Sequence, residues 1–456
     1  MLSYIELKNF KSLTNAMIDL RGENRKPKKI AFIYGENGSG KTNIISSMLF
    51  LEETLSTLTN AIELKEFLND KNYLNFLSDP ENYEERKRVI DKFLKEDLNL
   101  VSLDELIRDN KTIDCEEDME IKVGFNINGV EGSYELKFDN EAVIYEELKY
   151  LVNDRVRSLF RIDKGNVTFS PSLVLSTSYR KELKDNIEKY WGKNTFMSIV
   201  FYEFSIKNNT FTEKTLSRNF YNFYNWLKKI SLQCKSGNAI AERIATKKRI
   251  IPNIEKGEVD KEEDKEVRSM ENFLDGVFTQ LYSDIKKVFY VFTPFDNKYK
   301  YELYVKKLID GKLKDIPFTL ESTGTQRLID AIQFIFLYLE GNTVLVDELE
   351  NGIHDLLIYE VISSLLDSFD YSENSQFIAT THSTYLMEML PQENVYIIVS
   401  DAFGKKNIMS IDKFEFRTQK NNNIRLKYLR GDYSGIPNVG YLDFNDLIDQ
   451  FEEDLN

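Results

Sequence analysis

The stretch KIAFIYGENGSGKT, residues 29–42, decides the fold class of this chain of 456 residues. Its first half contains a compact apolar run, 30–34, which predicts a buried strand. Its second half, 35–42, fits the pattern G-x-x-x-x-G-K-[ST] of a loop that binds phosphate groups. After Gly40 the apolar residues recur at three- and four-residue spacings, which predicts a helix. A strand, this loop and a helix in that order predict a nucleotide site on an α/β fold.

Each part of the loop has a physical role in holding a nucleotide. Glycines permit positive φ angles and let backbone N–H groups close around an anion, and the following helix points its positive end at the phosphates. Lys41 can reach the β- and γ-phosphates, and the Thr42 hydroxyl can bind Mg²⁺. We therefore expect ATP to be held by Gly35, Asn37, Gly38, Ser39, Gly40, Lys41, Thr42 and Asn43. The alternative is a glycine-rich turn that binds no nucleotide.

A second apolar run, VLV at 344–346, ends in two acids, Asp347 and Glu348. Alone this is a weak signal, because strands often end in solvated acids. Paired with a phosphate-binding loop about 300 residues upstream it becomes strong, because Mg²⁺ and the attacking water then each need a carboxylate. We expect Asp347 to hold Mg²⁺ together with Thr42, and Glu348 to orient or deprotonate the water.

Two further candidates lie around this pair. His382 follows a predicted buried strand at 376–380, where it could contact the γ-phosphate and the attacking water, and the alternative is a capping or loop histidine. His354 is equally open to both interpretations. The small-residue turn at 321–326 precedes a long apolar helix, so it could bind an anion or simply cap that helix.

Composition restricts the remaining possibilities. The net charge of −15 disfavours a protein that binds DNA through bulk charge, although local basic patches at 26–29 and 247–249 leave DNA possible. Two cysteines give no disulfide framework or zinc spacing and suit a reducing compartment. No secretory signal and no long uncharged apolar stretch is visible, so we expect a cytoplasmic protein with no membrane segment.

The pattern along the chain suggests three regions. Residues 1–175 hold the phosphate loop and an antiparallel meander, in which alternating apolar residues at 121–127 and 134–138 flank the turn signal Asn128-Gly129. Residues 176–290 carry helical stripes and high charge, which predicts a helical insertion outside the nucleotide head. Residues 291–456 return to strands alternating with helices, which predicts a largely parallel sheet.

Taken together, the motifs resemble ABC-class ATPases of the SMC, RecF and OLD type, and most closely the smaller OLD-like bacterial ATPases. The resemblance rests on LKNFKSL (7–13), the phosphate loop, STGTQRL (322–328), VLVDELENGIH (344–354) and TTHS (380–383), in that order. It implies a P-loop ABC-type head with a mixed or antiparallel N-terminal lobe and a parallel-sheet C-terminal lobe. It also implies that Ser322 and Gly324 of one subunit cap ATP held by another, so that ATP lies at a dimer interface.

The resemblance also implies a biological setting. Many OLD-like ATPases of this size act with a separate effector, often a nuclease, in anti-phage defence, and this chain has no Asp-x-Asp pair after His382 that would indicate a nuclease of its own. The alternatives are an ATPase that acts directly on DNA in repair and, least favoured, a P-loop phosphotransferase. One departure is that no glutamine precedes Gln233, so the usual glutamine that couples the first lobe to Mg²⁺ is missing or replaced, with Glu146 or Glu147 as candidates.

Overall fold

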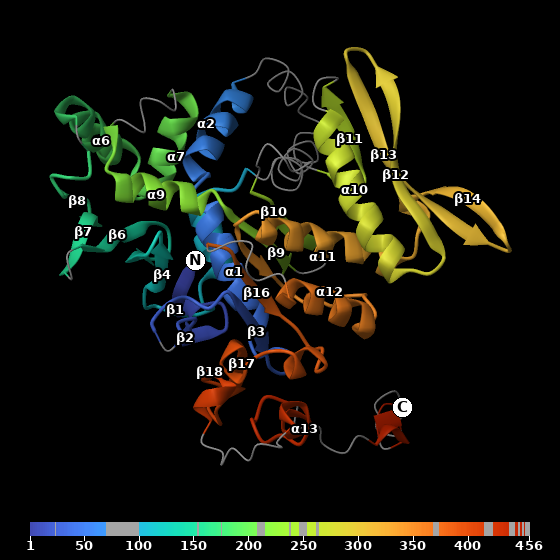
Figure 1. Cartoon of the computed structure of the whole chain (residues 1–456). Helices are drawn as coiled ribbons and strands as arrows, with labels where there is room; N and C mark the ends of the chain where they lie inside the picture. The colour runs from blue at the N-terminus through green and yellow to red at the C-terminus, as the bar shows by residue number, and fades with distance from the viewer. Residues whose placement is uncertain are drawn as a thin grey trace.

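The computed structural model describes the chain apart from residues 23, 70–99, 153–154, 175, 208–214, 237–238, 246–252, 261–263, 368–373, 415–422, 437–442, 446, 449–450 and 452–456. Three sheets organise the described part (Figure 1). None of its helices is long and apolar enough to cross a membrane.

The first sheet is antiparallel throughout, in the order β2-β1-β4-β5-β6-β7-β8. Its strands are β1 (Leu2–Phe10), β2 (Leu13–Asp19), β4 (Met119–Ile127), β5 (Val130–Phe138), β6 (Val143–Val152), β7 (Arg155–Asp163) and β8 (Asn166–Phe169). Asn128 and Gly129 both have positive φ angles, 53° and 81°, as a two-residue hairpin turn requires. The predicted meander is therefore confirmed.

The second sheet carries the nucleotide motifs, in the order β10-β9-β15-β16-β3-β17-β18. Its five central strands run parallel, and β10 and β18 add antiparallel edges. The strands are β3 (Ile30–Tyr34), β9 (Ile230–Ser236), β10 (Ala239–Arg243), β15 (Thr343–Val346), β16 (Gln376–Thr380), β17 (Val395–Ser400) and β18 (Lys406–Ser410). Strands β3, β15 and β16 are buried along their whole length, which explains their continuous apolar sequences.

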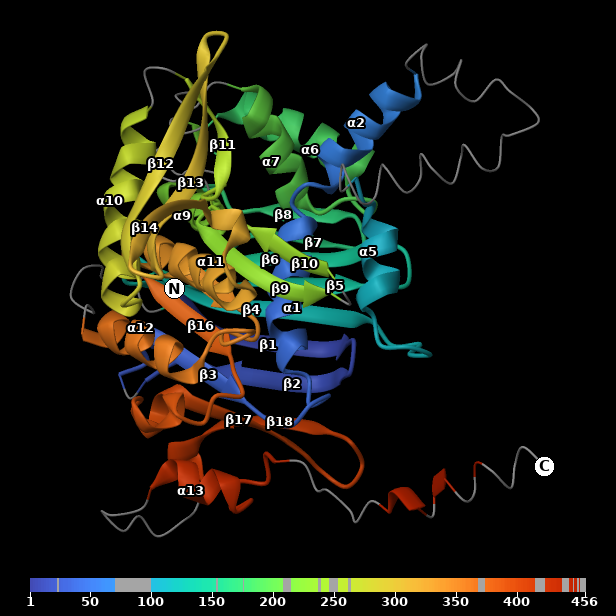
Figure 2. The same cartoon turned by 90° about the vertical axis from the view of Figure 1, so that its right-hand side faces the viewer.

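Helices cover both faces of this core sheet (Figure 2). Helix α1 (Lys41–Glu53) lies between the core sheet and the antiparallel sheet, and its Ile44, Ile45 and Met48 share one apolar cluster with residues of both. On the other face, α11 (Thr323–Leu339) and α12 (Asp355–Asp367) pack against Val344, Val346 and Phe377. The remaining helices are α2 (Thr57–Leu68), α5 (Leu103–Asn110), α6 (Thr177–Tyr190), α7 (Phe196–Ile206), α9 (Arg218–Leu227), α10 (Asp264–Leu281) and α13 (Ile424–Leu429).

The predicted α/β head, with an antiparallel N-terminal lobe and a parallel core sheet, is confirmed. The predicted limits of the helical insertion, 176–290, are wrong. Helices α6, α7 and α9 do occupy 177–227, but their buried residues join the cluster of the antiparallel sheet. Strand β9 then enters the core sheet beside β15, so the head is not interrupted over the whole interval.

The segment that lies outside the core sheet comes later in the chain, between β10 and α11. It consists of α10 and a third, antiparallel sheet made of β11 (Lys256–Asp260), β12 (Ile285–Phe295), β13 (Lys298–Ile309) and β14 (Lys312–Pro317). Residue 290, the predicted boundary, falls inside β12. Helix α10 lies inside the predicted interval and carries one of its helical stripes, whereas β12 begins inside the same interval at Ile285.

Candidate nucleotide-binding site

The loop at 35–42 connects β3 to α1 and is shaped as a cradle for an anion. Gly38 and Gly40 have φ angles of 79° and 99°, a region that side chains rarely adopt. A Cβ added at Gly40 would also lie 2.9 Å from Leu13 Cδ2, so only glycine fits there. Asn37 is exposed at the tip of the loop, and Asn43 Nδ2 donates to Ser12 Oγ at 2.8 Å.

Lys41 curls back over the loop. Its ammonium donates to the backbone oxygens of Gly35 and Glu36 at 2.9 and 3.0 Å. Burial lowers the pKa of this lysine, while nearby carboxylates, Asp347 first among them, oppose that shift. The ammonium is thus held in position above the loop by two carbonyl oxygens.

Strand β15 ends beside the phosphate loop, and the two acids follow it there. Thr42 Oγ1 donates to Asp347 Oδ1 at 3.2 Å, although the two residues are 305 positions apart. Thr380 Oγ1, at the end of β16, donates to the same Oδ1 at 2.6 Å and accepts from Glu348 N at 2.8 Å. Glu348 adopts a positive φ of 50°, an uncommon conformation for this residue type that turns the chain at the strand end.

The residues fit ATP and Mg²⁺. The Ser39 hydroxyl lies buried in the loop without a hydrogen-bond partner, as expected of a group that a phosphate would satisfy. A hydroxyl and a carboxylate oxygen at Thr42 and Asp347 are the hard ligands that Mg²⁺ prefers, and Mg²⁺ usually completes its shell with phosphate oxygens and water. No group of three or more His, Cys, Asp or Glu residues in the described ranges could hold a metal by itself, so Mg²⁺ here would depend on the nucleotide for further ligands.

His382 lies where the sequence places it, just beyond β16. Its backbone N–H donates to the Glu350 carboxylate, whose other oxygen is buried without a partner. The pKa of His382 is lowered, first by partial loss of solvent around the ring and then by the Lys41 ammonium, so the imidazole is neutral at pH 7. His354 has a structural contact instead, since its Nδ1 accepts from Leu356 N at the start of α12.

The turn at 322–324 begins α11. Ser322 is exposed, and its hydroxyl oxygen accepts from Thr325 N at 3.2 Å, so the expected helix cap is present. A Cβ on Gly324 would lie only 2.8 Å from the backbone oxygen of Gly352, in the loop that follows β15. The turn and this loop therefore pack backbone against backbone.

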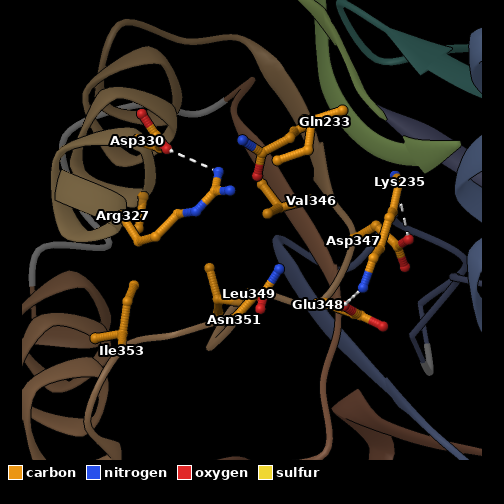
Figure 3. Close-up of a pocket in the computed structure, with 12 residues that line it drawn as sticks. Gln233, Lys235, Arg327, Asp330, Val346, Asp347, Glu348, Leu349, Asn351 and Ile353 are labelled. Carbon is orange, nitrogen blue, oxygen red and sulfur yellow. Dashed lines mark hydrogen bonds and ion pairs between the residues drawn. The ribbon is translucent and has the colours of Figure 1, made fainter. Parts of the chain in front are cut away.

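A cavity lies between β9, β10, α11 and the end of β15, and both acids face it (Figure 3). It is lined by Gln233, Lys235, Ile240, Arg327, Asp330, Ala331, Val346, Asp347, Glu348, Leu349, Asn351 and Ile353. Within it Lys235 Nζ lies 3.0 Å from Glu348 Oε2. Neither Ser322 and Gly324 nor the residues of the phosphate loop are part of this lining. The phosphate loop meets the acids through the contact of Thr42 with Asp347, and no such contact joins the 322–324 turn to them within the described residues.

The sequence misassigned two glutamates to this site and missed three residues that do lie beside the acids. Glu146 cannot replace the absent glutamine, because it is fully buried and accepts hydrogen bonds from Tyr134 Oη, Trp191 Nε1, Phe196 N and Met197 N. Glu147 pairs with Lys149 on β6. Gln233 and Lys235 are the residues that stand beside the acids, and Thr380, quoted only as part of TTHS, bonds both of them.

In the basic patch at 26–29, the Lys28 side chain is engaged within the fold. Lys28 Nζ donates to Tyr396 Oη at 2.8 Å and lies over that ring, and burial lowers its pKa. The patch at 247–249 falls outside the described residues.

Comparison with known proteins decides the family. The family described as "AAA domain, putative AbiEii toxin, Type IV TA system" matches residues 30–388, which span the phosphate loop, both acids and His382. The chain belongs to this family. This AAA domain places the chain among the P-loop ATPases, while the closer resemblance to the OLD type stays a prediction.

Solved structures add similarities of low identity. One is titled as the SmcHead bound to the C-winged helix domain of ScpA, at 16% identity and a TM-score of 0.40, covering 91% of this chain and 99% of that chain. Another is the SMC head domain from Thermotoga maritima, at 14% identity and a TM-score of 0.36, covering 90% and 98%. No curated protein matches this member of the AAA family.

Proposed function

We propose that this chain binds ATP with Mg²⁺ in the loop at 35–42 and hydrolyses it slowly, as the ATP-dependent switch of a self-associated complex. The observation that carries the proposal is the 3.2 Å contact of Thr42 with Asp347, which joins the phosphate loop to the acidic strand end. The contact brings together two motifs that are 305 residues apart, and it is explained if both motifs bind the same metal ion and nucleotide.

We assign a separate role in ATP binding and hydrolysis to each residue of the site. Lys41 and the loop N–H groups bind the phosphates, and Thr42 with Asp347 holds Mg²⁺, which when bound neutralises charge on the phosphates. Glu348, held at its backbone by Thr380, accepts a proton from the attacking water and orients it. The neutral His382 can hydrogen-bond at the γ-phosphate end of the site without adding charge.

The place of Ser322 and Gly324 supports the proposed self-association. Both start α11 outside the cavity that holds Asp347 and Glu348. We propose that they cap the ATP of a second subunit, so that the complete site needs at least two chains. Asn351, which lines the cavity from the loop after β15, would lie at the same interface.

The wider role we propose is in bacterial anti-phage defence, with a separate effector such as a nuclease. The family's description as a putative toxin of a toxin–antitoxin system supports a defence setting. Cells that carry the chain with its effector should restrict phage plaque formation, and Lys41→Ala should abolish that restriction. Full restriction by the Lys41→Ala variant would contradict an ATP-driven role.

The nucleotide site itself is tested by binding of fluorescent ATP with Mg²⁺. Lys41→Ala should abolish binding, whereas Lys65→Ala, at an exposed lysine near the end of α2, should leave binding unchanged. Glu348→Gln should keep ATP binding but lower turnover by about 10²–10⁴, which is typical for the loss of one positioned acid–base group. Unchanged binding in Lys41→Ala would refute the site.

A further inference from the structure

Strand β9 places a second lysine at the acidic end of β15. The two strands pair in parallel, with Val344 beside Ser231 and Val346 beside Gln233, so Lys235 comes level with Glu348 two residues further on. The backbone N of Lys235 lies 3.4 Å from Asp347 Oδ2, and its ammonium lies 3.0 Å from Glu348 Oε2 (Figure 3). Lys235 therefore touches both of the acids that the proposed ATPase uses.

The two partners of this ion pair are held to different degrees. Glu348 is anchored at its backbone, where its N–H donates to Thr380 Oγ1 at 2.8 Å. The Lys235 side chain is 47% exposed and that of Glu348 is 30% exposed, and ion pairs in such surroundings contribute little to stability. The ammonium can therefore leave this carboxylate at small cost when a stronger anion arrives.

The carboxylate that Lys235 occupies is the one that must be free for catalysis. A general base has to lie within hydrogen-bond reach of the attacking water, which itself lies against the γ-phosphate. A lysine that bonds Glu348 is consequently separated from that phosphate by no more than one water molecule. Lys41 is bound to Gly35 O and Glu36 O of the phosphate loop, so Lys235 on β9 is a second lysine with different partners.

We propose that Lys235 senses the terminal phosphate of ATP. Without nucleotide its ammonium bonds the Glu348 carboxylate, and when ATP binds it moves to the γ-phosphate and leaves Glu348 free for water. ADP, which lacks that phosphate, leaves the ion pair in place. The inference rests on the proposed function and assigns the discrimination between ATP and ADP to one side chain.

The first test compares the affinities of a non-hydrolysable ATP analogue and of ADP, both with Mg²⁺. Lys235→Met should weaken binding of the analogue about tenfold or more, the order expected when a hydrogen bond to a charged group is lost, and leave ADP binding unchanged. Lys235→Arg should recover most of the loss. Lys229→Met, at an exposed lysine just before the other end of β9, is the matched control and should change neither affinity.

The second test uses the unmodified sequence, so it does not depend on a variant folding. Acetylation of Lys235, followed by mass spectrometry, should slow when the ATP analogue is added but not when ADP is added, and Lys229 should react equally in both. Equal losses of ATP and ADP affinity in Lys235→Met, or no loss together with unchanged acetylation, would overturn the inference. If the wild type binds ATP through Lys41 while these results are negative, only Lys235 is misassigned; if it binds no ATP, the proposed function itself fails.

Discussion

Neighbouring carboxylates in this site occupy different environments. Asp347 is 5% exposed and receives hydrogen bonds from two hydroxyl groups, those of Thr42 and Thr380. Glu348 follows at once, but its positive φ turns the chain there, and its carboxylate pairs with Lys235, whose side chain is 47% exposed. The rigid acid suits a metal ligand, and the more open acid suits a base that must exchange partners.

A third carboxylate, Glu53 at the end of α1, makes stability depend on pH. Burial raises its pKa from 4.5 to about 7, and Asp109 adds to the shift while Lys11 opposes it. The folded protein therefore holds this proton more tightly than the unfolded chain, so stability falls as the pH rises from about 4.5 to about 7. The ionised form of Glu53 costs up to about 3 kcal/mol of unfolding free energy above that range.

Glu53→Gln should remove this dependence, because the amide stays neutral. In urea unfolding, its stability relative to the wild type should increase between pH 4.5 and pH 8 by at most about 3 kcal/mol. Glu63→Gln, at an exposed position on α2, is the control and should track the wild type. A constant difference between Glu53→Gln and the wild type over this range would show that Glu53 does not titrate as described.

The sequence predicts some residues of the site and not others for a clear reason. Lys41, Thr42 and Asp347 belong to contiguous motifs whose spacing is set by local geometry. Lys235 and Thr380 reach the site only through the register of β9 and β16 against β15, which pairs residues 113 and 33 positions apart. That register is a property of the assembled sheet.

Among the elements, β9 shows how tertiary context outweighs local pattern. Its sequence ISLQCKS alternates apolar and polar residues, and Ile230, Leu232 and Cys234 are all buried. The alternation is only three residue pairs long and lies between helical stripes. The sequence pattern therefore places this segment in the predicted helical insertion and does not predict a strand of the core sheet. Strands β3, β15 and β16 were predicted because both faces are buried and their apolar runs are unbroken.

The contact between α11 and the loop after β15 gives a prediction at this scale. Gly324→Ala places a methyl group 2.8 Å from Gly352 O, which forces two backbones apart and should cost about 1–3 kcal/mol of stability. It should also lower ATP turnover in concentrated protein, because the 322–324 turn moves. Thermal unfolding and turnover would be measured together.

Gly276→Ala is the matched control for this substitution. Gly276 lies in α10, where no atom stands within 4 Å of an added Cβ, so alanine should stabilise the protein by about 0.4–1 kcal/mol. Equal effects of the two substitutions would mean that the close approach of Gly324 to Gly352 has no energetic consequence.

At the scale of the whole molecule, the phosphate loop with its acids and the turn at Ser322 are the two parts of the proposed shared site. The phosphate loop, Asp347 and Glu348 meet at the ends of β3 and β15, while Ser322 stands exposed at the start of α11. Under the proposed shared mechanism, one chain alone has an ATP site without its γ-phosphate cap and a capping turn without its ATP. Two chains related by a two-fold axis can satisfy both at once, because each supplies its cap to the other's ATP.

Mixing two inactive variants tests this arrangement. Glu348→Gln lacks the base and Ser322→Arg blocks the cap, so each should turn over little ATP alone while still binding it. In a mixed pair, the Ser322→Arg chain keeps its Glu348 and receives the intact Ser322 of the other chain, which recreates one complete site. An equal mixture with random pairing should then recover about a quarter of wild-type turnover.

Turnover per chain of the wild type should also fall on dilution below the concentration at which it self-associates. If mixing restores no activity and turnover per chain stays constant where the protein is monomeric, each head works alone and Ser322 serves only as the cap of α11.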